Sequence, residues 1–158
     1  MAIVLASPNT IWACGDRRLT DSRTSRPLSS NGVKITDIGA TNGGAFLTYA
    51  GIGQIQSTEV SRWVYQTLRG SYGLSLDELF QRISTAAQPV LLSTAKRSGV
   101  NHMFIAAAIC DRKPCIYVLN QPMIVRKWEM KCDQAPRFDQ ILAISAPNAD
   151  QPLSDNSR

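Results

Sequence analysis

The sequence predicts a single α+β domain, in which short strands come before and after a pair of central helices. Three observations carry this prediction: apolar runs of strand length up to residue 50, two stretches with helical spacing between residues 54 and 98, and a return to strand patterns after Gly99. With 158 residues, of which 44% are hydrophobic, the chain is long enough for one domain with a real core. The expected architecture is antiparallel sheets with helices covering them from outside.

The first fifty residues predict two hairpins. Apolar runs at residues 2–6 and 10–14 flank the turn-prone Pro8-Asn9 and form the first hairpin. Residues 33–38 and 45–50 form the second, whose last strand is entered through two glycines. Residues 16–31 are polar and carry four arginines, so they are predicted to be a loop.

Two helices are predicted in the middle of the chain. Residues 54–69 have a helical apolar stripe that ends at Gly70, and its members are Val60, Trp63, Val64 and Leu68. The second helix starts at Ser75, because Ser75 and Glu78 have the spacing of a capping box. Pro89 is expected to kink this helix.

The remaining strands follow the second helix. Residues 103–110 and 115–119 predict a hairpin around a turn at residues 111–114, and residues 123–131 and 141–144 are two further candidates. From Ala146 onward, proline, aspartate and asparagine dominate. One domain is therefore expected over residues 1–146, followed by a disordered tail over residues 147–158.

Charge and hydrophobicity exclude several classes of function. The 17 basic and 12 acidic residues give a net charge of +5, but the basic residues are scattered, which argues against a nucleic-acid partner. No apolar run approaches the eighteen or so residues of a membrane span. The first fourteen residues contain no lysine or arginine, and residues 7–10 interrupt their apolar stretch, so they do not form a secretory signal and a cytoplasmic location is expected.

The cysteines give no sign of a metal site. Cys14, Cys110, Cys115 and Cys132 form no C-x-x-C pair, and His102 is the only histidine. Buried free thiols are the expected interpretation, with no metal and no other cofactor.

Three short motifs occur in a fixed order in the first part of the chain. They read Gly15-Asp16-Arg17-Arg18-Leu19-Thr20, then Val33-Lys34-Ile35, then Tyr49-Ala50-Gly51-Ile52-Gly53. In type, order and separation they resemble the proteasome β-subunit and its bacterial relatives among the N-terminal-nucleophile hydrolases. The resemblance covers residues 2–146 and thins after Leu119. It implies an αββα sandwich, a peptide or amide substrate, and assembly into homo-oligomers or with proteasome-like subunits.

The resemblance also implies a site. In that family the hydroxyl of an N-terminal threonine attacks the substrate, and the free α-amine of the same residue is the base. By resemblance, Lys34 favours the neutral amine and Asp16 holds the lysine. The backbone N–H of Gly51 would contribute to an oxyanion hole, and Ser145 would support the terminal amine.

Each assignment has an ordinary alternative. Asp16 and Lys34 could form a plain loop-to-strand ion pair, worth at most about 1 kcal/mol. Gly51 could belong to a simple turn. Ser145, which lacks the flanking glycines of the family pattern, could be any serine at a strand end. The three tryptophans are expected to be core or interface anchors rather than substrate contacts: Trp12, Trp63 and Trp128.

Two departures from the family weaken the expectation of activity. The sequence opens Met1-Ala2-Ile3, which offers no threonine, serine or cysteine. The two helices that follow the serine motif in the family are also missing, so a C-terminally truncated sandwich is expected, with one sheet face bare. The leading hypothesis is a peptidase or amidohydrolase family member that is inactive as written. A non-catalytic assembly subunit and a small ligand-binding protein are the alternatives.

Overall fold

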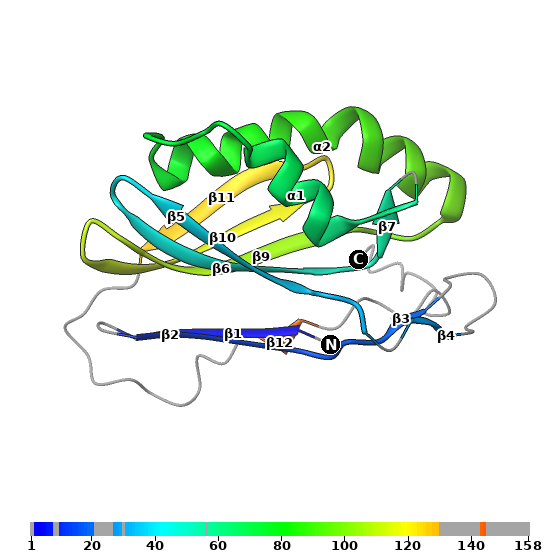
Figure 1. Cartoon of the computed structure of the whole chain (residues 1–158), viewed down its shortest axis with the longest axis horizontal. Helices are drawn as coiled ribbons and strands as arrows, with labels where there is room; N and C mark the ends of the chain where they lie inside the picture. Colours follow the sequence, from blue (N-terminus) through cyan, green and yellow to red (C-terminus); the bar gives the residue numbers. More distant parts are fainter. Residues whose placement is uncertain are drawn as a thin grey trace, which may run out of the picture.

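The computed structural model describes residues 2–7, 10–20, 27–29, 31–55, 57–129 and 143–144. Three layers follow one another in this part of the chain: two helices, a five-stranded sheet and a three-stranded sheet (Figure 1). Strand pairing is antiparallel throughout both sheets. The predicted α+β class with antiparallel sheets is confirmed.

The large sheet forms the middle layer. Its strand order is β11-β10-β9-β6-β5, and the two predicted hairpins that build it, β5–β6 and β9–β10, are confirmed. Strand β9 lies in the centre and is covered on both faces, which explains its nearly unbroken apolar sequence. The strand bounds are β5 Ile35–Ala40, β6 Gly43–Ala50, β9 Met103–Cys110, β10 Lys113–Asn120 and β11 Ile124–Glu129.

The small sheet covers one face of the large sheet. It consists of β1 (Ala2–Ser7), β2 (Thr10–Gly15) and β12 (Ala143–Ile144), in the order β12-β1-β2. Its inner side packs on the large sheet through a second hydrophobic cluster that includes Val4 and Ile105. The first predicted hairpin is confirmed, and of the predicted strand at residues 141–144 the described part, Ala143–Ile144, is strand.

The outer face of the small sheet corrects one sequence prediction, the burial of all free cysteines. Leu5 and Trp12 are directly opposite each other and are 40% and 64% exposed. Trp128 is also about half exposed, so neither tryptophan belongs to the core, whereas Trp63 packs against it. Cys14 is exposed too, because period-2 alternation places it on the same outer face as Trp12.

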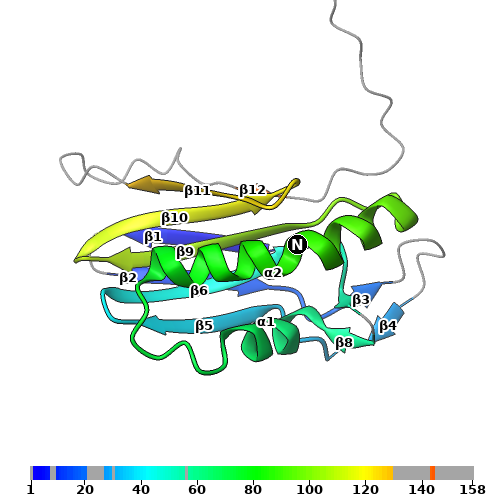
Figure 2. The same ribbon diagram turned by 90° about the horizontal axis from the view of Figure 1, so that it is seen from above.

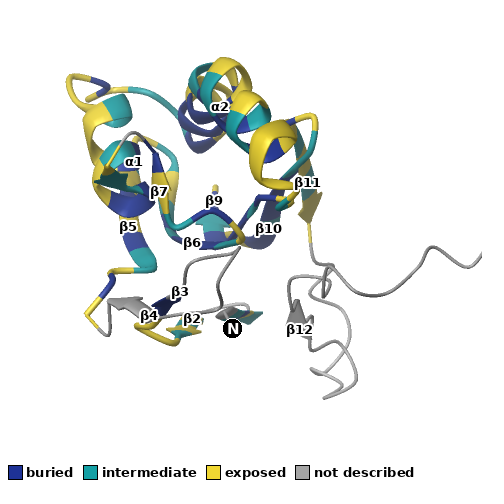
Figure 3. Ribbon diagram, turned by 90° about the vertical axis from the view of Figure 1, so that its right-hand side faces the viewer, coloured by how far each residue is buried: buried dark blue, intermediate teal, exposed yellow. Residues whose placement is uncertain are grey.

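The helices cover the opposite face of the large sheet (Figure 2). They are α1 (Val60–Leu68) and α2 (Leu76–Ser98), and their buried sides face the strands while their exposed sides face outward (Figure 3). The capping box of Ser75 and Glu78 is confirmed at the start of α2. Pro89 lies inside α2, and the kink expected there stays a prediction.

The predicted first helix begins too early. Residues 54–59 form a small hairpin instead, β7 (Gln54–Ile55) with β8 (Thr58–Glu59), in which Ser57 has a positive φ of 68°. The helix begins at Val60, whose N–H donates to the carbonyl of Gly53. A left-handed turn residue ends any helical path through this segment, whatever its apolar spacing.

The loop predicted at residues 16–31 also contains strand. Leu19–Thr20 (β3) pairs with Pro27–Ser29 (β4) in a short ribbon, and runs this short show no alternation in the sequence. Leu19 is buried, and a Cβ atom at Gly32 would lie only 2.6 Å from its Cγ. Leu19 therefore lies close against the backbone of Gly32, in the loop that leads to Lys34.

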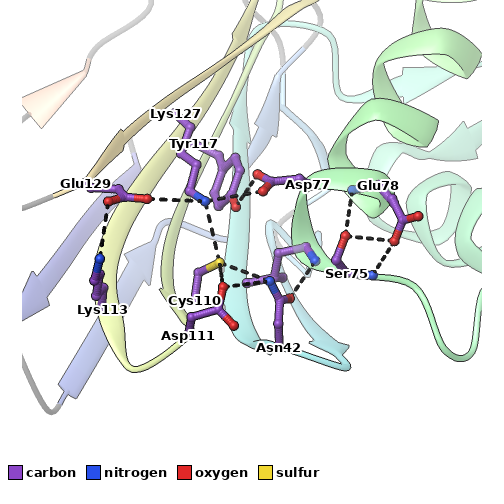
Figure 4. Close-up of polar contacts among 11 residues, drawn as sticks. Asn42, Ser75, Asp77, Glu78, Cys110, Asp111, Lys113, Tyr117, Lys127 and Glu129 are labelled. Atoms are coloured by element: carbon purple, nitrogen blue, oxygen red, sulfur yellow. Dashed lines mark hydrogen bonds and ion pairs between the residues drawn. The ribbon is translucent and has the colours of Figure 1, made fainter.

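The N-terminus of α2 is joined to the large sheet by a polar group that we name the anchor cluster: Asn42, Asp77, Cys110, Tyr117 and Lys127 (Figure 4). Asp77 accepts hydrogen bonds from the Tyr117 hydroxyl at 2.7 Å and from Lys127 Nζ at 3.3 Å. Asn42 accepts from the N–H of Leu76 and donates to Cys110 Sγ. Side chains from β9, β10 and β11, together with Asn42 in the β5–β6 turn, therefore hold the start of α2 in place.

Candidate functional site

Asp16 and Lys34 meet at the end of the large sheet where β5 begins and β6 ends, which we name the site end. Asp16 directly follows β2, and Lys34 directly precedes β5. Lys34 Nζ donates to Asp16 Oδ1 at 2.7 Å. The structure thus brings together two of the residues that the family resemblance singled out, 18 positions apart in the sequence.

The environment of this pair favours the charged form of Asp16. The Lys34 side chain is only 14% exposed, whereas that of Asp16 is 43% exposed. Partial burial opposes ionisation of the carboxyl group, but the hydrogen bonds and positive charges of Lys34 and of the N-terminal amino group outweigh it, and the pKa of Asp16 falls to about 2. The same Oδ1 accepts the backbone N–H of Arg18 at 3.0 Å, which fixes the carboxylate on its loop.

The start of β1 lies beside this pair. Ala2 pairs with Gly15, the residue before Asp16, in the β1–β2 ladder. A Cβ atom at Gly15 would lie 3.7 Å from Cβ of Lys34, so the two backbones approach closely here. An amine at the N-terminal end of β1 would therefore be next to a lysine–aspartate pair.

Gly51 lies at the same site end, one residue beyond β6. Its φ is +101°, and a Cβ atom there would lie 2.0 Å from the carbonyl oxygen of Asn101. Only glycine tolerates both the dihedral angle and the contact. The turn is required by the fold itself, and the oxyanion role of Gly51 stays a prediction.

Ser145 lies outside the described residues. The residue before it, Ile144, pairs with Ala2. Its predicted support of a terminal amine remains an expectation of the resemblance.

Two buried rings at the site end were missed by the sequence analysis. Tyr49 and His102 stack with a ring-centroid distance of 5.8 Å, and both are less than 5% exposed. Tyr49 belongs to the third motif and His102 is the only histidine, so both were visible in the sequence. Their proximity depends on the pairing of β6 with β9, which no local pattern reveals.

Two hollows on the described surface lie away from this end. One, of about 650 Å³, lies between α1 and α2 and is lined by polar side chains such as Gln66, Glu78 and Arg82. The other, of about 310 Å³, is lined by Ile11, Phe46 and neighbours near the β5–β6 turn, at the other end of β6. Neither includes a residue of the Asp16–Lys34 pair.

Other classes of site find little support. Among the described residues, no three histidine, cysteine, aspartate or glutamate side chains gather closely enough to hold a metal ion. Within the same part of the chain, neither helix has both the length and the apolar character needed to cross a bilayer.

No protein-family model and no curated protein sequence matches the chain. Among solved structures, it is similar to a Gly-1 mutant of Anbu from Hyphomicrobium sp. strain MC1, with a TM-score of 0.55 and 12% sequence identity. Anbu is a bacterial protein with the proteasome-like fold of the N-terminal-nucleophile hydrolases. The likeness is one of fold. It covers 80% of this chain but only 55% of that one, so the chain spans little more than half of the Anbu structure that it matches.

Proposed function

We propose that this chain is a proteasome-type relative of the N-terminal-nucleophile hydrolases, and that the form with Ala2 at the start of β1 does not hydrolyse peptide or amide bonds. The observation that carries the proposal is the position of the Asp16–Lys34 pair beside the first residue of β1. The fold shared with Anbu supports it independently. The αββα sandwich of that family is part of the proposal.

The chemistry that this arrangement suits is amine-assisted nucleophilic attack. An α-amine has a reference pKa of about 7.7 to 8.0, so a modest lowering makes it an effective base near neutral pH. A lysine ammonium nearby lowers the pKa of the amine by like-charge repulsion. Asp16 fixes the position of that ammonium at 2.7 Å, and Gly51 presents its backbone without a side chain in the way.

The group that would attack is missing from this position. Alanine has a methyl side chain, which cannot become a nucleophile. A form with threonine at the start of β1 and a free α-amine would hold both a hydroxyl and its base beside Lys34. The lysine–aspartate pair would then serve catalysis, whereas in the Ala2 form it only joins a loop to a strand.

The test is a gain of function. Intact mass spectrometry of the natively expressed protein first identifies its N-terminal residue. A chain that begins with threonine in place of Ala2, with Met1 removed, is then assayed with fluorogenic peptides and small amides. We expect hydrolysis, and we expect Lys34→Ala to lower its rate at least about 100-fold.

The matched control is Lys113→Ala, which removes an exposed lysine whose contact to Glu129 is 4.0 Å long. It is expected to leave the rate unchanged. Absence of hydrolysis in the threonine form, or equal losses in both lysine variants, would contradict a competent amine-based site.

A specific observation also favours an assembly role. The paired Leu5 and Trp12 expose apolar side chains on the outer face of the small sheet, and exposed apolar groups of this size often mark interaction surfaces. We therefore retain a non-catalytic subunit as the second candidate, with a homo-oligomer as its simplest form. A Trp12→Ser variant that leaves the molar mass measured by light scattering unchanged would count against it.

Three further parts of the proposal come from the sequence analysis. They are a single domain over residues 1–146, a peptide or amide substrate if a nucleophile is supplied, and a cytoplasmic location. Peptide profiling of the threonine form addresses the substrate, and limited proteolysis addresses the domain boundary.

A further inference from the structure

Three aromatic rings lie together under the site end. Tyr49 on β6 stacks on His102 at 5.8 Å, and His102 meets the edge of Phe104 at 4.6 Å. Tyr49 and Phe104 are cross-strand partners in the β6–β9 ladder, with ring centroids 6.5 Å apart. The cluster joins β6, which ends one residue before Gly51, to β9, which begins one residue after His102.

Tyr49 also reaches the strand that carries Lys34. The β5–β6 ladder pairs Ile35 with Thr48, so its continuation places Tyr49 across from Lys34. The Tyr49 hydroxyl donates to the carbonyl oxygen of Val33 at 3.4 Å. Burial, followed by the charges of Glu59 and Asp16, raises the pKa of this phenol, so it remains a donor at neutral pH.

His102 reaches the other half of the site. Its Cα lies 3.0 Å from the position that a Cβ atom on Gly51 would occupy, so the two backbones are in contact. The ring is 1% exposed, and neither of its nitrogens has hydrogen-bond geometry with a side chain or backbone group of the described residues. Burial lowers the pKa of His102 to about 3 against an opposing effect of the Ile52 backbone, which lies near the ring but outside hydrogen-bond geometry, so the ring is neutral and packs like a hydrophobic side chain.

We propose that Tyr49 and His102 are positioning residues, a stacked pair that fixes the backbone of Lys34 relative to the turn at Gly51. The Tyr49 hydroxyl contacts the backbone beside Lys34, the backbone of His102 contacts the turn at Gly51, and the stack of the two rings holds these two sides of the site at a fixed separation. Because the Tyr49 hydroxyl donates to the backbone carbonyl of Val33, the pair acts on Lys34 through the backbone. A catalytic role for Lys34 and Gly51 rests on the proposed function, whereas the positioning of their backbones by the ring pair does not.

The first readout is the pKa of the Asp16 carboxyl group, measured by carbon-detected NMR titration. Tyr49→Phe keeps the ring and removes the donor to Val33. We expect it to loosen the Lys34 backbone and raise the pKa of Asp16 from about 2 by about half a unit or more. His102→Leu removes the stacked ring at similar volume and is expected to have the same effect, while His102→Phe restores the ring and the low pKa.

The matched control is Tyr117→Phe, which removes a buried tyrosine hydroxyl from the anchor cluster at the other end of the sheet. It is expected to leave the pKa of Asp16 unchanged. An unchanged pKa in folded Tyr49→Phe and His102→Leu, as judged by their amide spectra, overturns the positioning role. A shift of equal size in Tyr117→Phe would overturn it as well.

The second readout separates this inference from the proposed function. In a threonine form that hydrolyses peptides, Tyr49→Phe should lower kcat with little change in KM. If no threonine form hydrolyses anything but the pKa of Asp16 still shifts in Tyr49→Phe and His102→Leu, the proposed function fails and the positioning pair stands. If hydrolysis occurs and the variants leave both kcat and the pKa of Asp16 unchanged, the proposed function stands and the positioning pair fails.

Discussion

The large sheet has a lysine–aspartate pair at each end, and the two pairs differ in what surrounds them. Lys127 and Asp77 lie 3.3 Å apart within the anchor cluster, where Tyr117 and Cys110 also contact them (Figure 4). Lys34 and Asp16 lie 2.7 Å apart at the site end, beside the first residue of β1. The lysine is the less exposed partner in both pairs.

The anchor cluster has a complete structural explanation. Burial and the hydrogen bond to Asp77 raise the pKa of Tyr117, and the contacts of Lys127 to Asp77 and Cys110 outweigh burial and raise its pKa. Every member holds the start of α2 against the strands. Strongly shifted titration is therefore no evidence of catalysis when the network already serves a helix terminus.

Among the described residues, the pair at the site end holds no helix terminus. The pKa of Asp16 is lowered by a lysine that directly precedes β5, and the glycine turn and the buried ring pair beside it contact no helix start. A pair of this kind contributes at most about 1 kcal/mol to stability because water screens the exposed carboxylate. The two ends thus differ in what their lysine–aspartate pairs hold: a helix terminus at one end, and a loop against the start of β5 at the other.

The largest effect should come from the glycines that close β6 at its two ends. Gly51→Ala at the site end and Gly43→Ala at the anchor end each place a Cβ atom within about 2 Å of a carbonyl oxygen on the facing segment, and both have positive φ angles. We expect each to lower the free energy of unfolding by about 3 kcal/mol or more. Urea unfolding followed by circular dichroism measures this.

The control for this prediction is Gly70→Ala, where φ is +76° but a Cβ atom would meet nothing within 4 Å. It should cost only about 1 kcal/mol. Equal effects at Gly70 and Gly51 would show that dihedral strain, and not the close approach of the strands, limits β6.

The second effect is a dependence of the free energy of unfolding on pH, which arises from His102 at the site end. The pKa of His102 falls from its usual 6.5 to about 3 in the folded protein, so the unfolded chain binds more protons between these values. Stability should therefore be complete above about pH 6.5 and fall by about 3 kcal/mol between about pH 7 and about pH 4.

Unfolding by urea at these two pH values measures the loss. His102→Phe should remove most of it, leaving the contribution of carboxylates such as Asp16, which begins only below about pH 4. If His102→Phe retains the full dependence on pH, burial of this ring is not its source.

The smallest effect distinguishes two buried tyrosines. Tyr117→Phe removes a 2.7 Å hydrogen bond to a carboxylate, and we expect a loss of about 1 to 2 kcal/mol. Tyr49→Phe removes a 3.4 Å contact to a neutral carbonyl and should cost less than about 1 kcal/mol. Thermal or urea unfolding of both variants gives the ranking, and the reverse order would contradict the division into an anchor end and a site end.

Local signals predicted much of the fold. Ser75 and Glu78 placed the start of α2 correctly because a capping box is a contact between near neighbours. The start of α1 was wrong because Ser57 adopts a positive φ and Val60 bonds back to Gly53, and neither fact appears in the apolar spacing. The β3–β4 ribbon was missed because its strands are too short to alternate.

The site was predictable only through resemblance. Asp16 and Lys34 were named because the family motifs occur in order, and their spacing alone would have suggested an ordinary ion pair. Tyr49 and His102 could not be connected from the sequence, since their contact depends on which residues of β6 and β9 face each other. Register between distant strands is set by the whole sheet.

The exposure of the indoles affects how the molecule can be observed. Trp12 and Trp128 are 64% and 49% exposed, and Trp63 is only partly covered. An indole in contact with water already emits at long wavelength, so intrinsic fluorescence should change little when the chain unfolds. The same property makes Trp12 a built-in optical reporter, since any molecule that covers the outer side of β2 should shift its emission to shorter wavelength and protect it from iodide quenching.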